Sequence, residues 1–406
     1  MSQLARQMQM VDALPDQDDS TWNNLADTTV MQKYQMAGGF ANAALRTVLS
    51  GCVAGASVGR LCTLGDEYIL SATAGVFTGK GKAGSEVERG IAFPTCVNVN
   101  SVVLNHASAA DDGLVLAAGD VVKVELGVHV DGYVATAAHT LLVGNNGGDS
   151  VPVPVPATGR VADAVCAAHV ACEAAVRLVR GGASHAAVFQ AVNRVAAAFG
   201  VRPVVGTASH VVRRFLLEAD ARIEHSSDPA DAPAPAARFA DNDVVAINIV
   251  MTDAHDPRLA EADFLHAAVL QRDVGLARPL RLQAARNAFN DAAHVFGVFP
   301  FSEHALIRRD RAHRLGLPEV IKSGLLAVRP VYVSAEPTAT TAHFKATVLV
   351  LPNNQGSMRL TAPFSPPYVH SDKSIDDETA ALLKQDVRIA KAKTVSSAHA
   401  NTMDMS

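Results

Sequence analysis

A long β-hairpin is the feature that most constrains the fold of this chain. Apolar residues run through positions 120–144 and are interrupted by the dipeptide Asp131-Gly132. Asp-Gly favours a two-residue turn, because both central residues of that turn take positive φ and these two residue types adopt it readily. The stretch therefore predicts two antiparallel strands joined by a tight turn.

The turn also predicts which residues of the two strands face each other. With Val130 opposite Tyr133, Gly127 faces Thr136, and Glu125 lies diagonal to Thr136 on the same face of the hairpin. Diagonal neighbours lie ~7–8 Å apart at Cα. Two carboxylates at such positions could share metal ions, but here only Glu125 is acidic.

Helical and strand patterns surround the hairpin and predict a mixed α/β fold. We expect helices at about residues 28–49, 57–77, 160–180 and 184–199, and strands at 90–100, 244–251 and 342–351. Segments rich in Gly, Pro or Lys predict loops at 80–89, 145–159 and 226–240. Residues 259–314 have a mostly helical pattern, and strand spacing returns beyond residue 331.

Composition excludes several classes of protein. The 406 residues carry a formal net charge of -5, so contact with nucleic acid needs a local basic patch. Neither a secretory signal nor an apolar run of about 18 residues is present, so we expect a soluble intracellular protein without a membrane span. Five cysteines without a CxxC pair predict reduced thiols: Cys52, Cys62, Cys96, Cys166 and Cys172.

Four sequence blocks, in order, carry a resemblance to a known family. They are Ile91-Ala-Phe-Pro-Thr, Lys123-Val-Glu-Leu-Gly-Val-His-Val-Asp-Gly-Tyr, Ser209-His210 and His343-Phe-Lys-Ala-Thr-Val-Leu-Val-Leu-Pro, followed by Met358-Arg-Leu-Thr and Pro363-Phe364. Over roughly residues 28–390 the chain resembles the proliferation-associated (ErbB-binding) proteins, which are similar to type 2 methionine aminopeptidases.

The resemblance implies an α/β (α+β) pita-bread fold of the metalloaminopeptidase and creatinase kind. It implies a flexible extension at residues 1–27, an aminopeptidase-like domain at 28–370 and a C-terminal tail at 371–406. A helical insert of the type 2 enzymes is expected within the domain, at about residues 258–325.

The resemblance also implies a degenerate metal site. The enzymes hold two divalent metals between two Asp, one His and two Glu, which fall here on Glu125, Thr136, His210, Asn248 and Lys345. Such metals prefer several anionic oxygens, whereas an ammonium has no lone pair to donate and repels a cation. We therefore expect no metal, no cofactor and no catalytic residue, with a Lys345 to Glu125 contact filling the space. The alternative is that Lys345 points to solvent from an edge strand.

His106 matches a substrate-facing His of the enzymes, but hydroxide at neutral pH comes from metal-bound water. Its retention is explained by a structural role or by a pocket that still accepts a peptide end. Two alternatives to a non-catalytic protein stay open. One is an aminopeptidase with a single metal held by Glu125 and His210, helped by Asp131 or Asp253. The other is a module that holds nascent N-termini around His106 and His210.

The expected insert is rich in arginine and has no lysine between residues 272 and 314. The eight arginines outnumber four acidic residues there, and arginine can grip phosphate with two hydrogen bonds and stack on bases. A solvated helix face would show the same pattern. The candidate RNA-binding residues are Arg272, Arg278, Arg281, Arg286, Arg308, Arg309, Arg311 and Arg314.

Members of the resembling family associate with large ribosomal subunits and structured RNA. The resemblance therefore implies a non-catalytic, monomeric protein of cytoplasm and nucleus or nucleolus, acting in ribosome biogenesis or translation. Its implied partners are the large subunit, ribosomal RNA and a nascent peptide. A second basic patch, at Lys384, Arg388, Lys391 and Lys393, is shorter than the tail of animal relatives. Thr379-Ala-Ala-Leu-Leu lacks the first Leu of an LxxLL box, so corepressor functions are not carried over.

Overall fold

The computed structural model describes residues 23–78, 87–146, 152–153, 157–219, 221–361, 364, 366 and 369–390. Most of the expected extension at 1–27, most of the loop at 80–89, and the tail residues Lys391 and Lys393 lie outside the described residues.

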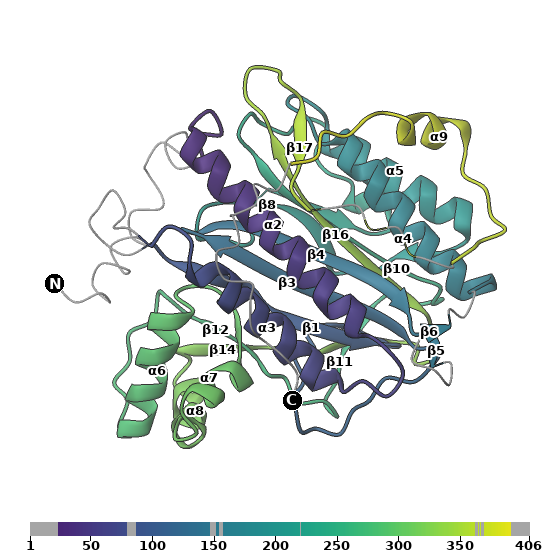
Figure 1. Ribbon diagram of the computed structural model, residues 1–406. Helices are drawn as coiled ribbons and strands as arrows, with labels where there is room; N and C mark the ends of the chain where they lie inside the picture. Colours follow the sequence, from purple (N-terminus) through teal and green to yellow (C-terminus); the bar gives the residue numbers. More distant parts are fainter. Residues whose placement is uncertain are drawn as a thin grey trace.

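A nine-stranded sheet forms the centre of the molecule (Figure 1). Seven strands follow the order β1 (Arg89–Val99), β3 (Val121–Val130), β4 (Tyr133–Leu142), β16 (Thr341–Val350), β10 (Val244–Thr252), β8 (Thr207–Val212) and β9 (Arg222–His225). Two short strands join at the side, with β17 (Ser357–Arg359) on β16 and β7 (Arg202–Pro203) on β10. These pairs are antiparallel. β4 and β16, which are distant in sequence, meet at the middle of the sheet.

Four long helices cover one face of this sheet in two pairs (Figure 1). The first pair, α2 (Thr28–Gly51) and α3 (Val58–Ala74), packs on β1, β3 and β4. The second pair, α4 (Gly159–Leu178) and α5 (His185–Phe199), lies over the other half, where α4 packs on β16 and β10. Each pair buries its own apolar cluster against the sheet. The four helices expected from the sequence are thereby confirmed.

The hairpin has the predicted turn and register. Asp131 and Gly132 take φ of 56° and 78°, and Val130 pairs with Tyr133. Gly127 pairs with Thr136, as predicted. Alternate residues of β3, among them Val124 and Leu126, enter the core beneath α2 and α3. Glu125 therefore belongs to the opposite face.

The insert departs from the expected pattern in its first part. Residues 259–282 are not helical: they contain β11 (Leu259–Glu261) and β12 (Val269–Arg272), so the helical expectation for 259–314 is wrong over this stretch. β12 pairs on both sides, with β13 (Phe301–Ser302) and β14 (Leu326–Arg329). A short apolar run buried on both faces has the same pattern in a strand and in a helix. The helices come later: α6 (Gln283–Val295), α7 (Glu303–Arg309) and α8 (His313–Lys322).

The smaller elements join these layers. β11 pairs with β15 (Tyr332–Ser334), which pairs in turn with β2 (Val102–Leu104). The expected loop at 145–159 includes a two-strand pair, β5 (Asn145–Asn146) and β6 (Pro152–Val153), and that at 226–240 includes a 3₁₀ turn, η2 (Pro229–Asp231). In the tail, α9 (Asp377–Leu383) packs on α4. The described cysteines are free thiols, and none of the described helices is long and apolar enough to cross a membrane.

Candidate functional site

Four of the strands bring one row of residues together on the face that the long helices leave uncovered. Glu125 on β3 pairs with Ala138 on β4, Ala138 pairs with Lys345 on β16, and Lys345 pairs with Asn248 on β10. Directly paired residues of antiparallel strands share a face of the sheet. The register thus places three of the five candidate ligand positions in one line.

Lys345 reaches Glu125 across the width of β4. Its Nζ lies 2.8 Å from Glu125 Oε1, and the two side chains are 10% and 5% exposed. The residue between them in the row is Ala138, whose single methyl group leaves room for the long side chain. The predicted contact is confirmed, and the alternative, in which Lys345 points to solvent from an edge strand, is wrong because β16 lies inside the sheet.

The ammonium also determines the charge state of the carboxyl group. Burial alone would raise the pKa of Glu125, yet Lys345, with a smaller effect of His343, lowers that pKa below its usual range. Glu125 is therefore an ionised group whose charge is already matched inside the sheet.

Asn248 is held by a histidine that the sequence reasoning did not single out. His343 Nε2 lies 2.6 Å from Asn248 Oδ1, and Asn248 Nδ2 donates to Ala208 O at 3.2 Å. Burial lowers the pKa of His343 to about 4, so the ring is neutral at pH 7 and Nε2 is the donor to the amide oxygen. The signal that could have found His343 is the two-residue period of a strand, which places it on the face of Lys345.

Thr136 takes part in a threonine seam between β4 and β16. Thr347 Oγ1 accepts from Thr136 N at 2.9 Å and donates to Thr136 O at 2.9 Å. Thr140 repeats this arrangement with the backbone N and O of His343, at 2.7 and 2.8 Å. Backbone pairing between these two strands is limited to Lys345 with Ala138, so the two hydroxyl groups complete the junction.

His210 lies on β8 and pairs with Ala246 of β10. Burial, together with Lys345, lowers the pKa of its ring to about 4, and its Nδ1 is buried with no hydrogen-bond partner among the described residues. Two charged residues that the sequence reasoning missed lie on this side. Burial would raise the pKa of Glu218, but His210 and Arg329 lower it below its usual range. Arg329 Nη1 lies 3.5 Å from Glu218 Oε1.

Among the described residues, no hydrogen bond joins His106 to this group. Its backbone N donates to Asn98 Oδ1 at 3.0 Å, and its ring Nδ1 lies 3.2 Å from Val97 O, so its bonds run to β1. Burial lowers the pKa of His106. The contacts of His106 are those of a packed, hydrogen-bonded structural histidine.

The two acids considered as helpers of a single metal lie elsewhere. Asp131 sits at the hairpin tip, 2.5 Å from Lys33 Nζ and 2.6 Å from Arg214 Nη2. Asp253 follows β10, and its carboxylate accepts from Arg160 Nε at 2.9 Å and from Thr340 N at 2.7 Å. Both are already paired, so the single-metal alternative loses these ligands. Within the described ranges, no three His, Cys, Asp or Glu side chains are placed to hold a metal ion.

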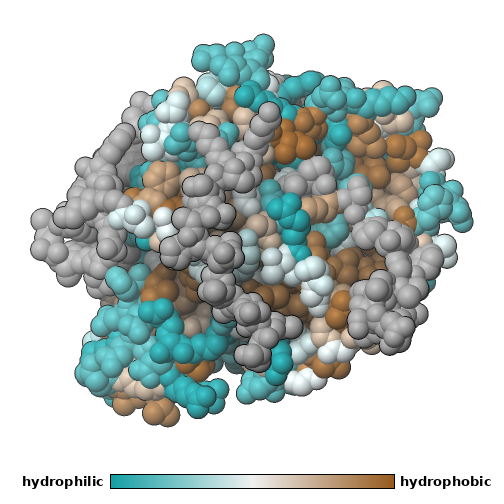
Figure 2. Space-filling model, in the orientation of Figure 1, coloured by the Kyte–Doolittle hydropathy of each residue, from teal (hydrophilic) through white to brown (hydrophobic). Residues whose placement is uncertain are grey.

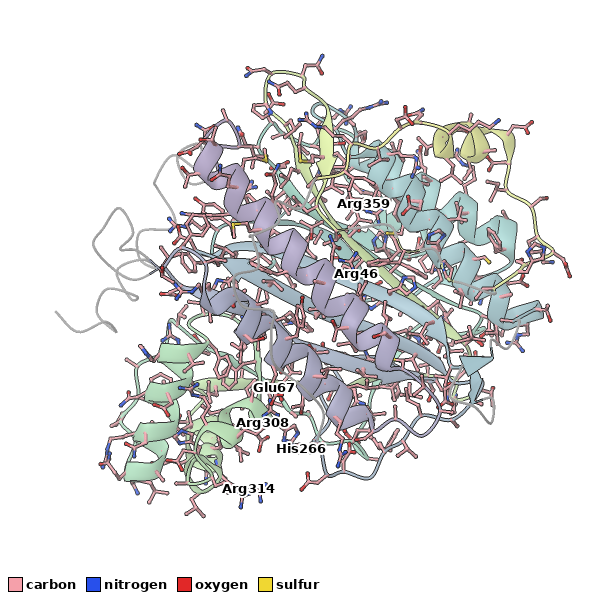
Figure 3. The ribbon with its side chains drawn as sticks, viewed as in Figure 1. Arg46, Glu67, His266, Arg308, Arg314 and Arg359 are labelled. Atoms are coloured by element: carbon pink, nitrogen blue, oxygen red, sulfur yellow. The ribbon has the colours of Figure 1, made fainter. Side chains whose placement is uncertain are left out.

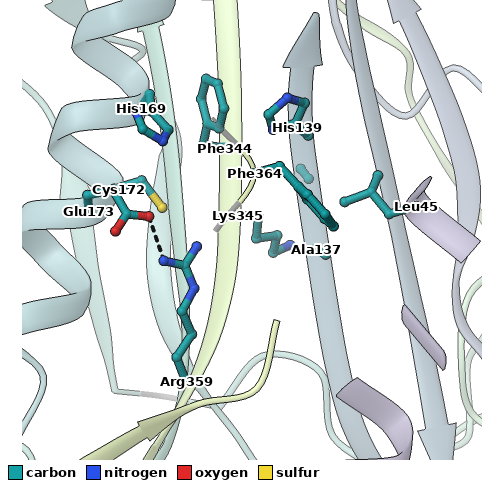
Figure 4. Close-up of a pocket in the computed structure, with 11 residues that line it drawn as sticks. Leu45, Ala137, His139, His169, Cys172, Glu173, Phe344, Lys345, Arg359 and Phe364 are labelled. Carbon is teal, nitrogen blue, oxygen red and sulfur yellow. Dashed lines mark hydrogen bonds and ion pairs between the residues drawn. The ribbon is translucent and has the colours of Figure 1, made fainter. Parts of the chain in front are cut away.

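On the other face of β4 and β16, a small pocket lies beneath the long helices (Figure 4). Phe344 packs between two histidine rings. Its ring centroid lies 5.0 Å from that of His139 and 5.3 Å from that of His169. Arg359 Nη1 lies 2.5 Å from Glu173 Oε1 at the edge of the same pocket. Buried polar pairs thus lie on both sides of the β4–β16 junction.

The insert exposes most of the arginines considered for RNA. Arg272 is the exception: it lies on β12 and is only 8% exposed, and burial lowers its pKa. The expectation that Arg272 belongs to a surface patch is therefore wrong. Figure 2 shows hydrophilic residues gathered over the insert, at the lower left. The exposed members are Arg278, Arg281, Arg286, Arg308, Arg309, Arg311 and Arg314.

These arginines form two groups instead of one patch. α6 and α8 run antiparallel, since Glu319 accepts from Arg281 N at 2.6 Å at one end and His313 Nε2 lies 2.8 Å from Asp291 at the other. The first group is Arg278, Arg281 and Arg286, and the second is Arg309, Arg311 and Arg314. Arg308 is separate, because its Nη1 donates to Thr63 Oγ1 of α3 at 3.1 Å, beside Glu67 (Figure 3).

Known proteins share this sequence and fold. The model of metallopeptidase family M24 matches residues 32–255. Proliferation-associated protein A of Dictyostelium discoideum is 34% identical over 383 residues, covering 94% of this chain and 95% of that protein. ErbB-3 binding protein 1 of Solanum tuberosum is 34% identical over 339 residues, covering 84% and 83%.

Two solved structures show the same fold. A thermophilic Arx1 superposes with a TM-score of 0.75 at 21% identity, covering 89% of this chain and 99% of that one. A methionine aminopeptidase of Thermotoga maritima gives a TM-score of 0.52 at 18% identity, covering 82% and 97%. The expected pita-bread fold is confirmed. This chain belongs to metallopeptidase family M24 and, within it, to the proliferation-associated, ErbB-binding proteins.

Proposed function

We propose that this M24 protein is non-catalytic and acts by associating with the large ribosomal subunit and with structured RNA, in ribosome biogenesis or translation. The observation that carries the loss of catalysis is the 2.8 Å contact between Lys345 and Glu125. It occupies the centre of the row in which the aminopeptidases place metal ligands.

The residues present do not fit the two metals that the family implies. A pair of divalent cations needs several carboxylates to offset desolvation and mutual repulsion. Here Glu125 is the one acid of the five positions, and it is already neutralised by an ammonium. Asn248 Oδ1 is engaged by His343. A hydrolytic step therefore has no activated water at this site.

The exposed arginines of the insert support the second half of the proposal. Two groups of three lie toward opposite ends of the α6–α8 pair, and α6 is 13 residues long, about 20 Å at 1.5 Å per residue. Groups at that spacing can bind separate phosphates of a folded RNA, whose backbone is recognised through its shape. The protein would then act as a monomer in the cytoplasm and the nucleus or nucleolus.

A second candidate is a peptide-binding function of the former cleft. The buried, unpartnered Nδ1 of His210 favours it, because a polar group of a bound peptide could satisfy that nitrogen. Crosslinking of a Met-initiated peptide carrying a photoreactive group would test it. Labelling near His210 would support the candidate, and labelling spread over the surface would count against it.

The main proposal is tested by three measurements on the full chain. Protein purified without chelator should contain metal well below one equivalent by elemental analysis, and Met-initiated peptides should remain uncleaved in added Co²⁺ or Mn²⁺. The chain should also co-sediment with large ribosomal subunits, with an affinity that falls as salt rises. Stoichiometric metal with turnover overturns the non-catalytic part, and absence of co-sedimentation at low salt overturns the ribosomal part.

A further inference from the structure

An apolar groove shares no lining residue with the former metal site or with the insert arginines. It has a volume of about 680 Å³, within the size range of ligand sites in proteins. One wall is the first half of α3 with the segment before it, and the other is the loop at residues 110–115. Its apolar lining includes Leu61, Leu64 and Val115, and the last two are 40% and 61% exposed.

The loop wall ends at Val115, an isolated bridge residue whose outward backbone groups have no partner in the part of the chain that the structure describes. Val115 and Ser57 form an isolated antiparallel bridge, flanked by bonds from Leu116 N to Ala56 O and from Val58 N to Leu114 O, both 2.9 Å. In such a pair the N–H and C=O of Val115 point away from the 55–58 segment. Neither group bonds to any residue that the structure describes. An extended segment could satisfy both groups at once.

The α3 wall of the groove presents a cation, Arg60. Arg60 is exposed and lines the groove, and it makes no ion pair within the described part of the chain. It lies in the first turn of α3, where the helix dipole adds positive potential instead of opposing it. Asp111 lies on the loop wall opposite, so an acidic group is favoured on the α3 side only.

We propose that this groove binds an extended acidic segment of a partner protein, which adds a strand along Val115 and places a carboxylate against Arg60. Apolar side chains of the segment, alternating with the acidic ones, would cover Leu61 and Leu64. Main-chain bonds then supply affinity, and the groove and Arg60 supply selectivity. This binding requires neither RNA nor the ribosome.

The probe is a fluorescein-labelled hexapeptide of alternating glutamate and valine, acetylated and amidated, measured by fluorescence anisotropy with the full chain. Saturable binding is expected, at least about tenfold tighter than that of the same peptide with lysine for glutamate. Arg60→Glu should reverse this preference. Arg309→Glu/Arg311→Glu/Arg314→Glu should leave it unchanged, which separates failure of this proposal from failure of RNA association.

A matched pair of variants tests the strand edge. Val115→Pro removes the outward N–H, and proline is tolerated where the N–H of an edge strand faces solvent, so the fold is kept. Val115→Ala shortens the same side chain and keeps the N–H. We expect about tenfold weaker binding for Val115→Pro than for Val115→Ala, with equal melting temperatures. Absent saturable binding, or equal affinities of the two variants, overturns the proposal. A dimer in sedimentation that Val115→Pro dissociates would instead assign the edge to a second copy of this chain.

Discussion

Lys345 and Glu125 form an ion pair across a strand to which neither belongs. Lys345 is on β16 and Glu125 on β3, and β4 lies between them. Strands are spaced ~4.8 Å apart, so the pair spans about 10 Å of sheet. It links the half of the sheet under α2 and α3 to the half under α4 and α5.

Removing the ammonium should be costly. Lys345→Met leaves Glu125 buried and ionisable without its partner, and breaking a buried pair in this way costs roughly 3–5 kcal/mol. Replacing both residues, in Lys345→Met/Glu125→Leu, removes both charges and should cost clearly less. Urea denaturation at pH 7 of the two single variants and the double variant measures the coupling. If the loss in the double variant equals the sum of the losses in Lys345→Met and Glu125→Leu, the pair contributes nothing.

The threonine seam gives a second prediction. Thr347→Val keeps the shape of the side chain but removes the hydroxyl that bonds Thr136 N and O. A buried N–H left without a partner costs roughly 1–3 kcal/mol. Thr347→Ser keeps the hydroxyl and loses a methyl group, so it should destabilise by only about 1 kcal/mol.

The measurement for this prediction is the free energy of unfolding in urea for both variants at one pH. If Thr347→Val is as stable as Thr347→Ser, the hydroxyl does not hold β4 to β16. Thr140, which bonds the backbone of His343 in the same way, provides an independent repeat with the same two substitutions.

The hairpin was predictable because its information is local. Asp131-Gly132 defines the turn, and the two-residue period of the strands then gives the pairing of Gly127 with Thr136. The contact of Lys345 with Glu125 joins residues 220 positions apart. Only the family resemblance placed these two residues in one site, because nothing local relates β16 to β3.

Other features depend on tertiary packing and were beyond the sequence. β12 is a strand because β13 and β14 pair with it on both sides, and this burial also takes Arg272 off the surface. The local pattern could not distinguish a short buried strand from a helix. The separation of the exposed arginines into two groups likewise follows from the antiparallel packing of α6 against α8.

The two arginine groups give a third prediction. If both contact RNA phosphates, reversing three charges in either group should weaken co-sedimentation with large subunits and reduce the salt dependence of binding by about one counterion per lost contact. The variants are Arg278→Glu/Arg281→Glu/Arg286→Glu and Arg309→Glu/Arg311→Glu/Arg314→Glu.

Sedimentation at stepped salt concentrations measures both effects. Arg180→Glu/Arg238→Glu is the control, since these arginines are exposed and lie outside the insert. An insert variant that binds like this control would show that its group does not face the RNA.

Acid should destabilise the protein in a defined window. Burial lowers the pKa of His343, His210 and His225 to about 4, against about 6.5 in an unfolded chain. As the pH falls from 6.5 to 4 the unfolded state takes up protons first, so the free energy of unfolding decreases. Each histidine can contribute about 3 kcal/mol to this loss over the full window. The pKa of Glu125 is lowered in the folded protein, so its contribution to stability is lost only as the pH falls below the usual pKa of a glutamate. That loss lies outside most of this window.

His343→Gln tests the origin of the acid sensitivity. Glutamine can still donate to Asn248 Oδ1, but it does not titrate, so the proton that His343 takes up on unfolding is removed while the contact to β10 is kept. Urea denaturation at pH 7.5, 6 and 5 should show a free energy of unfolding that falls less steeply for the variant, by up to about 1.4 kcal/mol per pH unit. The free energy of unfolding falls with pH because the ring of His343 is neutral in the folded protein. A proton that binds only on unfolding favours the unfolded chain. A slope equal to that of the unchanged protein would mean that His343 is already protonated in the native state, and with it a different hydrogen bond to Asn248.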